Sequence, residues 1–229
     1  MLFYKSLSEY RTQELARLQR LEESNIPERG VIAAVLSPAG RADAYAVNAA
    51  VEAIEVDSQG IVGDRHRCHS RPTNGREASL YPRGTLIRQH RHFFIVSRHD
   101  CQVLSERLGV AVTPALLGAN MVIDRLDGAA FSISELPRGT HILVIPPQAD
   151  TTPRPPIATL VHLGKQQGCG ITGHAIAQHH GDPALVRAFR AGSTDNRGII
   201  CSVEYPVQPA ATLTAGQQVV FRFPSGVIG

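Results

Sequence analysis

The sequence contains four cysteines, whose thiolates can act as nucleophiles, sulfur carriers or soft metal ligands. They lie far apart along the chain, at positions Cys68, Cys101, Cys169 and Cys201. No two of them form a Cys-x-x-Cys pair, so the spacing gives no zinc ribbon and no thioredoxin-like motif. In a reducing compartment we expect four free thiols. Because free cysteine packs as a small hydrophobe, we expect most of them to have no chemical role.

A second group of reactive side chains falls in the first half of the chain. Its members are Asp64, His66, Cys68 and His69, with His90 and His92 downstream. Carboxylate, imidazole and thiolate groups at such short spacing could bind zinc and leave a position open for hydrolysis. The chain has ten histidines, however, and these could equally be solvated polar residues of an arginine-rich loop. The pattern therefore indicates either a zinc-type hydrolase that uses the Asp64, His66 and His69 cluster or an ordinary polar loop.

Positive charge is concentrated between Arg65 and Arg98, although the net charge of the chain is only +3. Eight arginines lie there against one acid, Glu77; they are Arg65, Arg67, Arg71, Arg76, Arg83, Arg88, Arg91 and Arg98. A guanidinium group matches phosphate or carboxylate with two parallel hydrogen bonds, which favours a small phosphorylated ligand. The alternative is that arginine is simply the default surface cation of a chain whose lysines are Lys5 and Lys165.

Length and composition predict one globular domain. The chain has 229 residues, of which 43% are hydrophobic and 19% charged. No run approaches the roughly 18 apolar residues of a membrane span, so we expect no membrane insertion. The start of the chain is polar and charged, unlike a signal peptide, which favours a cytoplasmic location. The small net charge and the absence of tryptophan give no support to nucleic-acid binding.

The hydrophobic pattern changes along the chain from a helical to a strand-like period. Residues 3–23 are typical of an amphipathic helix, so we expect residues 1–30 to form an N-terminal helical extension and residues 31–224 to form the main domain. Strands are expected at 31–36, 51–56, 93–96, 121–123, 142–145, 158–163, 199–203 and 219–223. Short helices are expected at 100–108 and 182–189. Many short strands separated by turn residues favour a mainly β barrel or sandwich with a few peripheral helices.

Five stretches, read in order, resemble the molybdenum cofactor sulfurase C-terminal (MOSC) domain family. They are GIVGDRH at 60–66, IRQ at 87–89, LGANMVI at 117–123, GCGITGH at 168–174 and NRGII at 196–200. The resemblance covers about Val31 to Phe223 and implies a closed β-barrel. It also implies that Cys169 is the catalytic residue and the metal ligand. Gly168 and Gly170 would let the backbone approach a bulky ligand closely.

The family resemblance implies two kinds of chemistry. The domain either binds a pterin molybdenum cofactor (molybdopterin), as in molybdenum-dependent reductases of N-hydroxylated compounds, or carries sulfur on its cysteine. Cofactor contacts are implied for Asp64, Arg65, Arg88, Ser97, Asn120 and Arg197. Competing interpretations remain for several of these residues. Asp64 could cap its own turn, Arg88 could be a solvated surface residue, and Asn120 and Arg197 could be ordinary turn residues.

Some positions depart from the family pattern, namely Ala119, Gly168 and Gly170, which leaves a non-catalytic ligand-binding or sulfur-carrier module as an alternative. With only Lys5 and Lys165 available for a Schiff base, this chain is not expected to bind pyridoxal phosphate. A sulfur donor would then be a separate cysteine desulfurase. Redox turnover of a small-molecule substrate would need an external reductase. The pattern does not indicate an oligomeric state.

Overall fold

The computed structural model describes residues 29–38, 47–73, 79–146, 155–193, 195–206 and 209–224. The predicted N-terminal helix lies outside these residues. The strands are β1 (Arg29–Pro38), β2 (Asn48–Val51), β3 (Ala53–Asp57), β4 (Gly60–Ile61), β5 (Ser70–Pro72), β6 (Leu86–Arg88), β7 (Phe93–Val96), β8 (Met121–Arg125), β9 (His141–Ile145), β10 (Ala158–Lys165), β11 (Ile199–Tyr205), β12 (Ala211–Thr214) and β13 (Gln218–Arg222). The helices are α2 (Arg98–Leu108), α3 (Pro114–Leu117), α4 (Gly170–His180) and α5 (Leu185–Gly192), with a 3-10 turn η1 (Ile133–Glu135).

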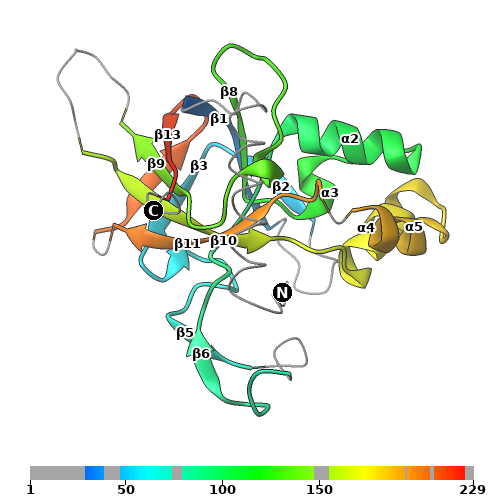
Figure 1. The fold of residues 1–229 in the computed structure, drawn as a ribbon, viewed down its shortest axis with the longest axis horizontal. Helices are drawn as coiled ribbons and strands as arrows, with labels where there is room; N and C mark the ends of the chain where they lie inside the picture. Colours follow the sequence, from blue (N-terminus) through cyan, green and yellow to red (C-terminus); the bar gives the residue numbers. More distant parts are fainter. Residues whose placement is uncertain are drawn as a thin grey trace, which may run out of the picture.

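Seven strands form a closed barrel (Figure 1). The order around it is β13-β9-β10-β11-β7-β8-β1, and β1 pairs with β13 to close the circle. All pairings in the barrel are antiparallel except that of β7 with β8. Closure removes the free sheet edges that would otherwise invite aggregation. The mainly β, closed-barrel fold expected from the sequence is therefore confirmed.

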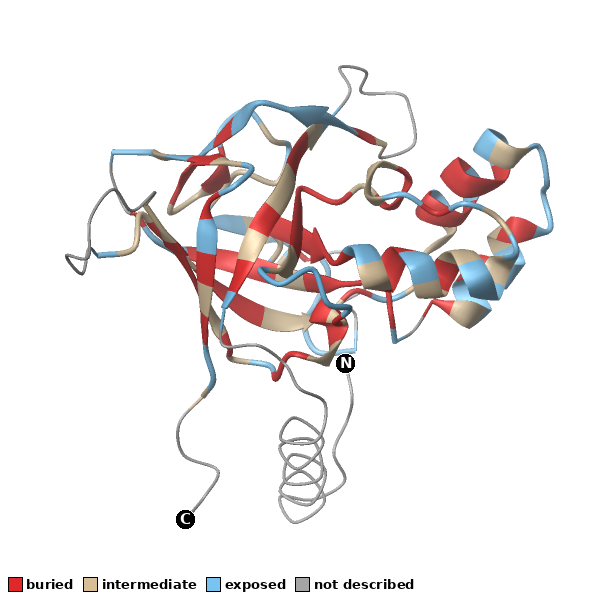
Figure 2. Ribbon diagram, turned by 90° about the horizontal axis from the view of Figure 1, so that it is seen from above, coloured by how far each residue is buried: buried red, intermediate tan, exposed pale blue. Residues whose placement is uncertain are grey.

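Two apolar clusters share strand β7, which is buried along its whole length. Phe93 and Ile95 point into the barrel core, where they join Ile32, Met121 and other inward-facing residues. Phe94 and Val96 point outward into a second cluster with residues of the helices. A strand covered on both faces is expected to be continuously apolar, as this one is. Figure 2 shows the helices gathered on one side of the barrel.

Several predicted elements correspond closely to the observed ones. The strand expected at 93–96 is β7, and the helix expected at 100–108 is α2, which ends at Gly109 with φ 68°. Helices α3 and α4 and the short strands β5, β6 and β12 are not anticipated by the sequence pattern. Among the residues that the structure describes, no helix has the length and apolar character needed to cross a membrane.

Candidate thiolate site

Cys169 occupies the N-cap position of α4. Its backbone is extended, with φ −130° and ψ 156°, and the helix begins at the next residue. The four first backbone N–H groups of a helix lack internal partners, so this end carries a partial positive charge. The thiol is half-buried and makes no side-chain capping hydrogen bond. A helix terminus, which the sequence pattern did not indicate, therefore holds the cysteine.

Arg197 is buried beside this cysteine. Its side chain is 1% exposed and is among the largest fully buried side chains of the described residues. The guanidinium carbon lies 5.7 Å from the centre of the Phe94 ring and 5.3 Å from that of Phe189. Both distances are within the range of cation–π attraction. The arginine is thus clamped between the outer face of β7 and helix α5.

The guanidinium group faces the N-terminal turn of α4. Nη2 lies 3.5 Å from Cys169 Sγ and donates to Thr172 Oγ1 at 2.6 Å, and Nη1 donates to the carbonyl of Gln167. Thr172 Oγ1 is also 3.5 Å from Cys169 Sγ. A buried cation is costly unless a negative group offsets it. Of these three partners, only the thiol can ionise.

The pKa of Cys169 is lowered to about 7 by these neighbours. Burial is the largest influence and by itself would raise this pKa. The positive charge of Arg197, hydrogen bonds from the side chain and backbone of Thr172, and the hydrogen bond from Arg197 together outweigh it. Near neutral pH about half of the thiol is therefore thiolate, the form that acts as nucleophile and soft ligand.

The glycines on either side of the cysteine differ in purpose. A Cβ at Gly168 would lie 2.4 Å from Ser193 Oγ and 3.1 Å from the carbonyl oxygen of Arg190, so this glycine admits the end of α5. A Cβ at Gly170 would meet nothing within 4 Å. The close approach at Gly168 is therefore to the chain's own helix and not to a ligand, contrary to the expectation from sequence.

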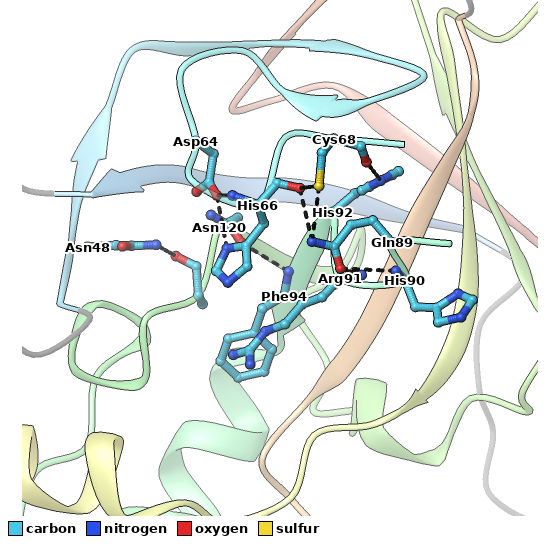
Figure 3. Close-up of polar contacts among 11 residues, drawn as sticks. Asn48, Asp64, His66, Cys68, Gln89, His90, Arg91, His92, Phe94 and Asn120 are labelled. Carbon is cyan, nitrogen blue, oxygen red and sulfur yellow. Dashed lines mark hydrogen bonds and ion pairs between the residues drawn. The ribbon is translucent and has the colours of Figure 1, made fainter. Parts of the chain in front are cut away.

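A chain of polar contacts connects the thiolate site to the arginine-rich segment. With its amide oriented to satisfy both groups, the side-chain oxygen of Gln166 accepts from Arg197 Nη1 and Arg91 Nη2, each at 3.1 Å. Gln89 Oε1 accepts from the backbone N–H of Arg91 at 3.3 Å, and its Nε2 lies 3.6 Å from Cys68 Sγ. Figure 3 shows Gln89 facing Cys68 in this loop.

Two of the predicted cofactor contacts are engaged in local backbone structure (Figure 3). Asp64 Oδ1 accepts from the backbone N–H of His66 at 2.7 Å and lies 2.9 Å from its Nδ1. Burial would raise the pKa of Asp64, but the hydrogen bonds and charge of His66 and the charge of Arg65 lower it. Asn120 Oδ1 accepts from the N–H of Phe94 at 3.0 Å and so joins β7 to the start of β8.

The other predicted contacts fall into different environments. Ser97 is fully buried as the N-cap of α2, where its Oγ accepts from Asp100 N at 3.1 Å in a capping box. Arg65 and Arg88 are exposed, and Arg88 lines a surface hollow together with Ser58, His69, His92, Val203 and Glu204. Only Cys169 and Arg197 of the predicted residues are brought into contact with each other. Ligand roles for all six predicted cofactor contacts, including Ser97 and Arg197, stay predictions.

The residues of the zinc hypothesis do not form a ligand set. No group of three or more histidine, cysteine, aspartate or glutamate side chains converges among the described residues, which include Asp64, His66 and His69. His92 has both ring nitrogens occupied, because Nδ1 accepts from Val203 N at 3.0 Å and Nε2 lies 3.2 Å from the Cys68 carbonyl. Burial is the main cause that lowers the pKa of His92, which favours this neutral, structural form.

The four cysteines are free, and their environments differ. Burial, together with the charges of Asp100 and Asp124, raises the pKa of Cys101 to about 12. Burial also raises the pKa of Cys201, which is 0% exposed in the barrel core. Cys68 is half-buried in the loop before β5. Of the three whose pKa is shifted, Cys169 is the one made more acidic.

Sequence reasoning missed three residues of this site: Thr172, Gln166 and Phe189. None of the three stands out in the sequence as a reactive group. Each contacts Arg197 only because the fold packs distant segments together. The one available signal was the order Cys169-x-x-Thr172, in which a threonine follows three residues after a helix N-cap.

The chain is thus a closed β-barrel protein with a cysteine of lowered pKa at a helix N-terminus. Comparison with known proteins identifies its family. A family model described as the MOSC domain matches residues 64–220, more than half of the chain. The chain belongs to the MOSC domain family.

Relatives support the same assignment. YuaD of Bacillus subtilis (strain 168), provisionally named a metal-sulfur cluster biosynthesis protein, is 29% identical over 158 residues, which are 68% of this chain and 74% of YuaD. The crystal structure of the YuaD protein from Bacillus subtilis has a TM-score of 0.69 and 24% identity, over 86% of this chain and 97% of that one. It shows the same fold. The crystal structure of YiiM from Geobacillus stearothermophilus gives a TM-score of 0.48 at 14% identity, over 84% and 75% of the two chains, and is too distant to support an argument.

Proposed function

We propose that this MOSC protein accepts sulfane sulfur on Cys169 and carries it as a persulfide. The proposal depends on one observation, the contact of 3.5 Å between Cys169 Sγ and the buried guanidinium of Arg197. A cysteine beside a fixed cation at a helix N-terminus has a larger thiolate fraction at neutral pH than an ordinary cysteine, and the thiolate is the form that attacks a sulfane sulfur.

The transfer step needs no oxidant or reductant. The Cys169 thiolate attacks the outer sulfur of a donor persulfide, so that a new S–S bond forms at Cys169. The S–S bond of the donor breaks at the same time, and the donor leaves as a thiolate. The attacking charge leaves with the donor thiolate. The transferred outer sulfur brings its own proton, and release of this proton to solvent leaves the negative charge on the terminal sulfur of the Cys169 persulfide.

Three features of the chain support this step. Arg197 offsets the negative charge on the thiolate before transfer and on the persulfide after it. Thr172 Oγ1, already accepting from Arg197 at 2.6 Å, can direct its own hydrogen toward Cys169 Sγ. The N-terminus of α4 adds its partial positive charge. Each of them favours the anion over the neutral thiol.

The donor in this proposal is a separate protein of the cysteine desulfurase class. A pyridoxal phosphate enzyme needs a lysine for its Schiff base. Lys165, the lysine within the described residues, lies at the end of β10 with its Nζ 3.6 Å from a carboxylate oxygen of Glu135. That amine is paired with a carboxylate, so the proposal assigns the Schiff base chemistry to the separate desulfurase.

The residues fit a retained pterin molybdenum cofactor poorly. Cys169 would be a suitable soft ligand, but Ser97 is 0% exposed within the cap of α2. Asn120 uses its side-chain oxygen on β7, and Arg197 faces the chain's own cysteine rather than a phosphate. Four of the six predicted contacts are thus engaged within the protein: Asp64, Ser97, Asn120 and Arg197. We therefore propose sulfur carriage without a step through the cofactor, and no reductase activity.

The test uses the full chain with a cysteine desulfurase of the same organism and L-cysteine. Persulfides are trapped by alkylation and located by peptide mass spectrometry. The test variant is Cys169→Ser, and Cys68→Ser is its matched control. We expect sulfur on Cys169 in the wild type and in Cys68→Ser only. Sulfur found on Cys68 in the wild type would overturn the proposal. Stoichiometric molybdenum and pterin in untagged protein would instead support the cofactor role.

A further inference from the structure

We infer that Asp100 is a positioning residue that holds Arg197 against Cys169 by anchoring the neighbouring Asn196. The use of this role in sulfur transfer rests on the proposed function. The positioning itself is argued from the contacts of Asp100 and Asn196. Asp100 lies in the first turn of α2, 69 residues from Cys169 in the sequence, and is 0% exposed.

The carboxylate of Asp100 makes more contacts than a capping box requires. In a capping box, the third helical residue bonds back to the N-cap backbone. Asp100 Oδ2 does so, accepting from the N–H of Ser97 at 3.5 Å and from its hydroxyl at 2.9 Å. Oδ1 accepts from the hydroxyl of Ser132 at 2.5 Å and from Asn196 Nδ2 at 3.3 Å. The second oxygen therefore joins α2 to two distant segments.

The turn that carries Arg197 is anchored on both sides. Before it, the side chain of Asn196 is held by Asp100. After it, Gly198 N donates to Ser134 Oγ at 2.9 Å, and Gly198 O accepts from Gln166 N at 2.9 Å. Ser134 is itself fully buried. With both neighbours fixed to buried groups, the direction in which Arg197 leaves the backbone is fixed as well.

The glycine in this turn leaves no room for adjustment. Gly198 has φ +93°, and a Cβ there would lie 2.3 Å from the carbonyl oxygen of Ile95. The turn is thus pressed against β7 and can relax mainly on the Asn196 side, where Asp100 holds it. Because the attraction between Arg197 and the thiolate falls with distance, release of Asn196 should weaken it.

The direction in which the pKa of Cys169 shifts when Asp100 is removed distinguishes a positioning role from a direct effect of the Asp100 charge. Burial raises the pKa of Asp100. Removal of its ionised form would, through space, stabilise the Cys169 thiolate and lower the pKa of Cys169, and removal of its neutral form would have no through-space charge effect. Loss of positioning has the opposite result, because the cation moves away from the sulfur. A rise in the pKa of Cys169 in a variant that lacks Asp100 can therefore come only from the second cause.

The experiment measures the pH midpoint of alkylation of Cys169 by iodoacetamide, read from its peptide by mass spectrometry. Asp100→Ala should move the midpoint from about 7 toward the ordinary cysteine value of about 8.5. Asp100→Asn keeps an oxygen for Asn196 and should restore much of the shift. The control is Thr113→Ala, which removes a cap from α3, where Thr113 Oγ1 accepts from Leu116 N at 3.2 Å. It should lower the melting temperature without moving the midpoint.

A folded Asp100→Ala protein with the wild-type midpoint would overturn the inference. If that variant does not fold, Asn196→Ala removes the same hydrogen bond from its other end, and an unchanged midpoint there has the same meaning. The proposed function fails separately: it is contradicted when the wild-type midpoint itself lies near that of an ordinary cysteine, whatever the variants do.

Discussion

Replacement of Arg197 by methionine should convert Cys169 into an ordinary thiol. Methionine is unbranched and apolar, so it can fill the space between Phe94 and Phe189 that the arginine stem now occupies. The substitution removes the charge and the hydrogen bond that lower the pKa of Cys169 while leaving the burial that raises it. The fold of the barrel does not depend on this charge, because its core lies on the other face of β7.

The size of the effect follows from the shift. If the pKa of Cys169 rises from about 7 to between about 8.5 and 9, the thiolate fraction at pH 7 falls about 15- to 50-fold. A more basic thiolate is also a better nucleophile, with a Brønsted slope of about 0.4–0.5, which returns about five- to eightfold of that loss. The net rate of alkylation at pH 7 should therefore fall about three- to sixfold. Above pH 9 the variant should react faster than the wild type.

The assay is the full pH profile of alkylation of Cys169, followed by mass spectrometry of its peptide. Arg67→Met is the matched control, because Arg67 Nη2 lies 2.5 Å from Asp57 Oδ2 in a different ion pair. That variant should keep the wild-type midpoint. A folded Arg197→Met protein whose profile coincides with that of the wild type would refute the reasoning, since the thiolate would then not depend on the guanidinium.

Other changes should separate reactivity from stability. Cys169→Ser removes a thiolate whose folded pKa, about 7, lies below its unfolded value. The wild type should thus be more stable than the variant by about 1 kcal/mol at pH values above about 8.5, and this advantage should be lost as pH falls through 7; a pH-independent difference in melting contradicts this. Gly168→Ala, whose Cβ would lie 2.4 Å from Ser193 Oγ, should destabilise the fold by about 1–3 kcal/mol in urea, whereas Gly170→Ala should not. Ser97→Ala should lower stability by about 1–2 kcal/mol in the same assay but leave sulfur loading unchanged, and loss of loading in folded protein would return Ser97 to the site.

The barrel was predictable because its strands carry a strong local pattern. The run Phe93–Val96 is apolar throughout since both of its faces are covered, and α2 is bounded by Ser97 and Gly109, both of which are recognisable caps. The closure of the barrel came from the family resemblance, and the strand order was not predicted. Pairings such as that of β1 with β13 join distant segments, which local periodicity does not encode.

Helix α4 was missed because its residues look unsuited to a helix. Gly170 and Gly173 lower helix propensity by about 1 kcal/mol each relative to alanine. The structure explains Gly173, where a Cβ would lie 3.1 Å from the carbonyl oxygen of Val186, so the glycine lets α4 and α5 pack closely. Tertiary packing therefore overrides propensity here. A C-terminal helix signal was present in the sequence at Gly181, the C-cap glycine, which has φ 70°.

Arg197 was named from the sequence as a cofactor contact, but its position beside Cys169 was not predicted. An Asn-Arg-Gly turn ordinarily exposes its arginine to solvent. Burial of Arg197 requires Phe94 from β7 and Phe189 from α5, which come together only in the folded chain. The anion site expected in the arginine-rich segment stays a prediction, and three of its arginines have partners within the protein. Arg67 pairs with Asp57, Arg98 pairs with Asp124 and Arg91 meets Gln166.

The central claim is that sulfur is carried by the Cys169 thiolate, and polysulfide loading of the four single Cys→Ser variants tests it most directly. Because polysulfide is a small donor, no partner protein is needed, and trapped persulfides are assigned by peptide mass spectrometry across pH 5–9. We predict that wild type and the Cys68, Cys101 and Cys201 variants load Cys169 with a midpoint at pH about 7, and that Cys169→Ser loads no equivalent site. Equal loading of Cys169→Ser and wild type would contradict the account.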